Sequence, residues 1–69
     1  MIGVVRAFDE PRGLGEVEVD GRAPYPFHCT QIADGTRTIE VGTRVEFEVR
    51  PGQLGRWEAR VLRLAPPPA

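Results

Sequence analysis

Apolar and polar residues alternate along short runs of this chain, and glycine or proline residues separate the runs. The alternation is strictest from Thr43 to Arg50, where Val45, Phe47 and Val49 are separated by charged residues. A period of two places the apolar side chains on one face of a β-strand and the charged side chains on the other. The pattern therefore predicts half-buried strands as the main elements of this protein.

Five runs of this kind fit within the 69 residues, with turn signals between them. Imperfect phase in the first run predicts either a β-bulge or a strand with both faces partly covered. Asp20-Gly21 is a strong hairpin signal after the second run. Short strands in so small a chain predict an all-β barrel, because closure removes the exposed edges of an open sheet. The expected strands cover residues 1–8, 14–19, 25–28, 43–50 and 56–64, and residues 30–32 are compatible with one helical turn.

The barrel is expected to form a single domain over residues 1–64, followed by a proline-rich disordered tail over residues 65–69. Cys29 is the only cysteine, so no disulfide can form within one chain. The sequence shows no signal peptide and no apolar run of the roughly 18 residues that cross a membrane. We therefore expect a cytoplasmic protein with no membrane partner, and a monomer is the expected oligomeric state.

Residues 12–19 read Arg-Gly-Leu-Gly-Glu-Val-Glu-Val and are the first candidate for a binding surface. Period two places the leucine and both glutamates on the face offered to solvent or a ligand, and both valines on the buried face. Gly13 and Gly15 leave the backbone with little side chain over it, so a ligand can approach closely. The run predicts a strand that offers one face for binding.

Five segments of the chain resemble the bacterial cold-shock domain family. Gly3–Asp9 is similar to the family's opening pattern Gly-x-Val-x-Trp-Phe-Asn, and Arg12–Val17 is similar to its first RNP motif, Lys-Gly-Phe-Gly-Phe-Ile. Tyr25–Cys29 resembles the second RNP motif, Val-Phe-Val-His-Phe. Gly42–Val49 and Gly55–Val61 resemble the fourth and last strands. The resemblance implies a five-stranded antiparallel barrel of the oligonucleotide-binding (OB) type.

Departures from the family pattern fall on one surface. In the family, aromatic rings on the outer face of the second and third strands stack against bases, and such stacking is worth about 1–3 kcal/mol per base. Of the family's stacking side chains only His28 is present in this chain. Glu16 also places a carboxylate where a phosphate-bearing strand is expected to lie. The positions that have lost a ring are Ala7, Leu14, Glu16, Pro26, Cys29 and Thr36.

The resemblance implies a nucleic-acid site with residues in distinct roles. Arginines at family-like or flanking positions are expected to hold the phosphate backbone, and His28 is expected to contact bases. Trp57 has two interpretations: alternation with Ala59 and Val61 places it inside the barrel, whereas the family pattern places it beside the nucleic acid. We expect Trp57 to be partly exposed and to supply a relocated stacking platform. The expected site comprises Arg6, Arg12, Gly13, Leu14, Gly15, Pro26, His28, Arg56 and Trp57.

Single-stranded RNA or DNA is the expected partner, bound weakly and with little sequence preference, as by an RNA chaperone or a regulator of transcription or translation. The net charge of −1 argues against a strong general polyanion binder but allows a local basic stripe. The alternative is an OB-fold protein-interaction module that has lost nucleic-acid binding. Leu14, Pro26, Cys29 and the exposed aromatic residues are expected to form an apolar patch, fringed by Glu16 and Glu18, which favours a protein partner.

Catalysis, a cofactor and a bound metal are not expected. His28 and Cys29 are adjacent, so alternation places their side chains on opposite faces of a strand, which argues against a metal site and against a nucleophile–base pair. The spaced glutamates at 16 and 18, and at 46 and 48, are interpreted as solvated strand faces. The sequence shows no cofactor motif, so we expect a binding protein and not an enzyme.

Overall fold

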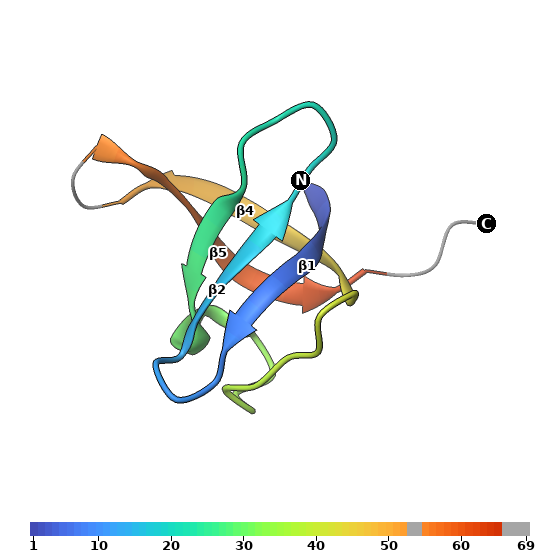
Figure 1. The fold of residues 1–69 in the computed structure, drawn as a ribbon, viewed down its shortest axis with the longest axis vertical. Helices are drawn as coiled ribbons and strands as arrows, with labels where there is room; N and C mark the ends of the chain where they lie inside the picture. The colour runs from blue at the N-terminus through green and yellow to red at the C-terminus, as the bar shows by residue number, and fades with distance from the viewer. Residues whose placement is uncertain (53–54, 66–69) are drawn as a thin grey trace.

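The computed structural model describes residues 1–52 and 55–65 and contains five strands and one short 3₁₀ helix, η1. All pairings between neighbouring strands are antiparallel, and the strand order is β3-β2-β1-β4-β5 (Figure 1). The all-β prediction is confirmed. The elements are β1 (Ile2–Asp9), β2 (Leu14–Glu18), β3 (Tyr25–His28), η1 (Cys29–Gln31), β4 (Arg44–Pro51) and β5 (Trp57–Leu64).

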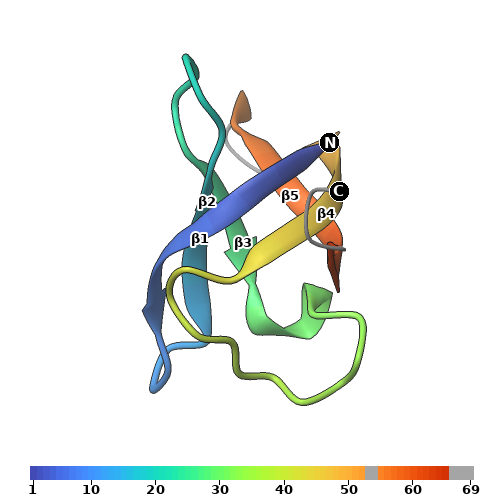
Figure 2. The ribbon, with the colours of Figure 1, turned by 90° about the vertical axis from the view of Figure 1, so that its right-hand side faces the viewer.

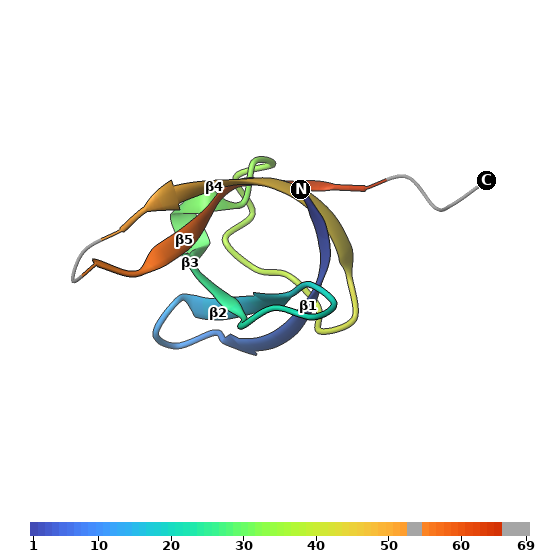
Figure 3. The same cartoon turned by 90° about the horizontal axis from the view of Figure 1, so that it is seen from above.

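The sheet curls into a ring, which is clearest when the molecule is seen from above and from the side (Figures 2 and 3). The segment after η1 joins the two ends of the strand order. Ile32 forms a parallel bridge with Leu62, and the Ala33 amide donates to the Leu62 carbonyl at 2.8 Å. This connection completes a small barrel of the OB type, as the sequence predicts.

Apolar side chains from every strand fill the interior of the barrel. Phe27 from β3 lies over Gly15 of β2, and its ring stacks on Phe8 with centroids 6.0 Å apart. Ile39 packs against this core from the long connection before β4. The buried core residues are Val5, Val17, Phe27, Ile32, Val45, Phe47, Ala59 and Leu62.

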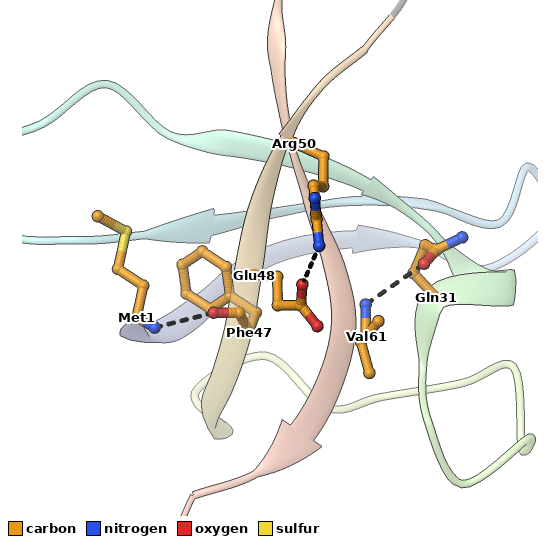
Figure 4. A network of polar contacts seen from close by, with 6 residues as sticks. All are labelled: Met1, Gln31, Phe47, Glu48, Arg50 and Val61. Carbon is orange, nitrogen blue, oxygen red and sulfur yellow. Dashed lines mark hydrogen bonds and ion pairs between the residues drawn. The ribbon is translucent and has the colours of Figure 1, made fainter.

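Two irregularities interrupt the regular pairing of neighbouring strands. The register of β1 against β2 shifts between Val5 and Ala7, which confirms the bulge predicted in the first strand. The register of β4 against β5 shifts between Glu46 and Glu48, and opposite that shift Val61 adopts a left-handed φ of 56°. The Val61 amide donates to Gln31 Oε1 at 3.3 Å, so η1 ties down the irregular part of β5 (Figure 4).

The alternation expected in the fifth strand is wrong. It places Trp57, Ala59 and Val61 together on the inner face, yet only Ala59 is buried. The backbone at Val61 shifts the phase, so that Leu62 enters the core in place of Val61. Trp57 pairs with Pro51 at the outer end of the β4–β5 hairpin and is 57% exposed. The structure thus supports the exposed interpretation of this residue.

Both ends of the described barrel are tied to β4. The amino terminus donates to the Phe47 carbonyl at 2.9 Å (Figure 4). The Phe47 amide donates in return to the Met1 carbonyl at 2.8 Å. The Ala65 amide donates to the Arg44 carbonyl at 3.0 Å. Residues 66–69 of the expected tail lie outside the described residues, as do residues 53–54 of the β4–β5 turn. Within the described ranges, no helix has the length and apolar character needed to cross a membrane.

Candidate functional site

The outer faces of β1, β2 and β3 form one continuous surface. Register places Ala7, Glu16 and Pro26 side by side across the three strands. A second row runs through Leu14 and His28, which pair directly. The outward positions predicted from period two are therefore gathered on one side of the barrel, and Leu14 is 48% exposed there.

Two adjoining hollows lie along this surface. The first, here called the strand hollow, is lined by residues 7–9, 14–16 and 26–27 together with Arg56. The second, here called the loop hollow, is lined by residues 22–26 together with Arg56 and Trp57. Pro26 and Arg56 line both hollows, so the start of β5 continues the face made by the first three strands. Of the expected site residues, Leu14, Gly15, Pro26, Arg56 and Trp57 line these hollows, whereas Arg6, Arg12, Gly13 and His28 line neither.

Two of the expected phosphate-binding arginines have carboxylates beside them. Arg6 Nε lies 3.4 Å from Glu16 Oε1, and Arg6 Nη1 lies 3.8 Å from Glu18 Oε2. Arg12 Nε lies 3.6 Å from Asp9 Oδ2. These pairs are solvent-exposed, and such pairs are typically worth about 0–1 kcal/mol, so a phosphate can compete with them. Sequence reasoning missed the Arg6–Glu16 pair, because it depends on the register between β1 and β2.

His28 is exposed at the end of β3 and caps η1. Its Nδ1 lies 3.0 Å from Thr30 Oγ1 and accepts from the Thr30 amide at 3.3 Å. The prediction that His28 and Cys29 point to opposite faces is wrong, because the strand ends at His28 and Cys29 begins η1. Cys29 Sγ lies 3.9 Å from His28 Nδ1. The two side chains are therefore neighbours, and the alternation that argued against a nucleophile–base pair does not apply to them.

The two glycines at the start of β2 have packing roles. Gly13 has a φ of 67°, and a β-carbon there would lie 2.6 Å from Cys29 Sγ. A β-carbon on Gly15 would lie 2.7 Å from Phe27 Cε1 and 2.9 Å from the Ala7 carbonyl oxygen. Both glycines thus allow neighbouring parts of the barrel to approach closely. That they also allow a ligand to approach remains a prediction.

Thr36, where the family pattern has a loop phenylalanine, stabilises a polar turn in this chain. Its amide and hydroxyl donate to Asp34 Oδ1 at 3.0 and 2.8 Å. These hydrogen bonds, the backbone one first, hold the pKa of the Asp34 carboxyl below its ordinary value. Within the described part of the chain, no group of three or more His, Cys, Asp or Glu side chains is arranged to hold a metal ion.

Comparison with known proteins identifies close relatives, although no model of a protein family matches the chain. Cold shock protein CspA of Staphylococcus aureus (strain USA300) is 38% identical over 63 residues, which cover 90% of this chain and 96% of the relative. CspA of Staphylococcus haemolyticus gives the same values. Cold shock protein CspB of Bacillus caldolyticus is 36% identical over an equal span. These similarities extend through all five strands of the barrel, and the chain therefore belongs to the cold-shock protein family.

Proposed function

We propose that this protein binds single-stranded RNA or DNA weakly, with little sequence preference, on the outer face of β1–β3 and the start of β5. The observation that carries this proposal is the exposed indole of Trp57, which lies beside Arg56 in a hollow that continues the β1–β3 face. Membership of the cold-shock protein family supports nucleic-acid binding in general. We expect the protein to act in the cytoplasm as a monomer and to have no catalytic role.

Each expected site residue has a place in this proposal. Arg6, Arg12 and Arg56 contact phosphates, and His28 and Trp57 contact bases. Leu14 and Pro26 supply an apolar surface between His28 and Trp57. Gly13 and Gly15 carry no side chain there and so allow the nucleic acid to approach the backbone closely. Two ring platforms replace the larger set of the family pattern, so the proposal predicts modest affinity.

The salt dependence of binding tests this proposal. Each phosphate neutralised on a single strand contributes about −0.7 to the slope of log K against log salt concentration. Contacts from Arg6, Arg12 and Arg56 therefore predict a slope of about −2. We would measure the anisotropy of a fluorescein-labelled oligothymidine over a range of salt concentrations. Absence of binding at low salt would refute the proposal.

A protein-interaction module is the second candidate function. Leu14 and Trp57 are 48% and 57% exposed, and the carboxylates of Glu16 and Glu18 lie beside Arg6. An exposed apolar surface with its basic residue partly neutralised also suits a protein partner. The anisotropy titration separates the two candidates, because only nucleic-acid binding predicts a response to the labelled strand.

A further inference from the structure

We infer that the loop hollow is a nucleotide-binding subsite in which a base stacks on Trp57 and the adjoining phosphates lie on Arg22 and Arg56. The inference rests on the proposed function and adds Arg22 as a binding residue. Arg22 belongs to the β2–β3 loop, outside the motifs that carry the family resemblance. It also makes the loop hollow, and not the outer face of β2 and β3, the place where the nucleic acid is bound most strongly.

Charge distinguishes Arg22 and Arg56 from the other candidate arginines. Neither guanidinium lies within 4.0 Å of a carboxylate among the described residues, whereas Arg6 and Arg12 each do. A phosphate that approaches Arg6 or Arg12 must displace a carboxylate. A phosphate that approaches Arg22 or Arg56 has no such competitor in the described part of the chain, so the loop hollow offers it the stronger attraction.

The Arg22 side chain contacts a partly buried tyrosine that packs against the core. Its Nη1 donates to the Tyr25 hydroxyl at 3.4 Å. The Tyr25 ring packs against Phe47 with centroids 5.9 Å apart, which fixes the position of the hydroxyl. This contact favours a position of the Arg22 side chain beside Tyr25, where both residues line the loop hollow.

The apolar lining of the hollow suits a flat aromatic ring. Pro24, Pro26 and Tyr25 line it together with the 57% exposed indole of Trp57. Its volume of ≈ 510 Å³ falls within the range of small-molecule sites, about 300–1,000 Å³. A lining that contains aromatic rings and two arginines matches a nucleotide, which combines a base with negatively charged phosphates.

Pro26 and Arg56 line both hollows, and they indicate the path of the bound nucleic acid. From a base on Trp57, the next nucleotides pass Pro26 and Arg56 into the strand hollow and reach Leu14 and His28. The subsite therefore anchors one end of a short footprint. A change at Trp57 or Arg22 is expected to reduce affinity more than a change at Arg6 or Arg12.

Binding of labelled oligothymidine to matched variants tests the subsite. Arg22→Gln is expected to reduce affinity and to make the salt slope about 0.7 less steep, as loss of one phosphate contact does. Arg63→Gln is the control, because Arg63 is exposed on β5 at the far end from Trp57 and also lies beyond 4.0 Å of any described carboxylate. Trp57→Ala is expected to reduce affinity at least about fivefold, whereas Trp57→Phe retains most of it.

An oligonucleotide made of abasic units separates the contribution of base stacking to the affinity from the contribution of phosphate attraction. If a base lies on Trp57, the abasic strand binds the wild type more weakly than oligothymidine does, and Trp57→Ala no longer changes its affinity. Circular dichroism of each variant confirms that the barrel has folded. Equal binding by Arg22→Gln and Arg63→Gln would overturn the subsite while leaving the proposed function in place. An unchanged affinity in Trp57→Ala would overturn the subsite and also the base contact that the proposed function gives to Trp57. Failure of the wild type to bind at low salt would instead refute the proposed function.

Discussion

Glu16 distinguishes the candidate surface of this protein from the aromatic surface that the family pattern implies. It lies between Ala7 and Pro26 in the row across the sheet, and its carboxylate is 3.4 Å from Arg6 Nε. A negative charge here repels a phosphate and also occupies the arginine that would attract one. The alternation in the sequence correctly predicts that Glu16 points outward. Its pairing with Arg6 depends on inter-strand register, which a single sequence does not specify.

Removing the Glu16 charge is expected to strengthen nucleic-acid binding. Glu16→Gln keeps the size of the side chain and frees Arg6 for phosphate, so affinity at low salt should rise about two- to fivefold, the effect of a typical exposed ion pair. Anisotropy of labelled oligothymidine measures the change. Glu46→Gln on β4 makes the same change in net charge away from the two hollows. Equal gains in the two variants would show that Glu16 acts only through net charge.

Gly15 illustrates how packing beneath the surface restricts a position on the surface strand. A β-carbon at this position would meet the Phe27 ring and the Ala7 carbonyl. Gly15→Ala is therefore expected to lower the free energy of unfolding by about 1–3 kcal/mol, the usual cost of overpacking. Leu14→Ala, at the neighbouring exposed position, should change it by no more than about 0.5 kcal/mol. Urea unfolding measures both, and similar losses in the two variants would contradict the packing role.

At the scale of elements, the positions of the strands were easier to predict than which of their side chains face the core. Period two and the glycine and proline turns place all five strands close to their observed bounds. Trp57 and Val61 do not follow the alternation, because β5 contains an irregularity at Val61 and begins beyond the core at Trp57. Both effects depend on what the strand packs against. The helical turn expected at residues 30–32 is found one residue earlier, as η1.

The hydrogen bond from Val61 to Gln31 is expected to stabilise the irregular part of β5. Gln31→Ala removes the acceptor for the part-buried Val61 amide, so the free energy of unfolding should fall by about 1 kcal/mol. Gln31→Glu keeps an oxygen at the same reach and should restore most of the loss. Urea unfolding gives the stability, and hydrogen exchange of the Val61 amide shows whether the local structure has opened. An unchanged exchange rate in Gln31→Ala would contradict this role.

At the scale of the whole molecule, the distribution of charge matters more than its sum. The net charge is −1, yet Arg22 and Arg56 both line one hollow whose remaining lining carries no acidic side chain. The strand hollow, in contrast, includes Asp9 and Glu16. The family resemblance correctly predicts the barrel because glycines and core residues are retained. Where affinity is concentrated on that barrel depends on which arginines have carboxylate neighbours, and this becomes visible only in the folded structure.

Trp57 is the only tryptophan, so its fluorescence reports directly on the loop hollow. Titration with an unlabelled pyrimidine single strand at low salt, and again at high salt, tests the central claim that this exposed ring is a base-stacking platform. We predict saturable quenching at low salt that weakens as salt is added. No change in Trp57 fluorescence at saturating strand concentration and low salt, with the indole still accessible to a small quencher, would contradict the claim.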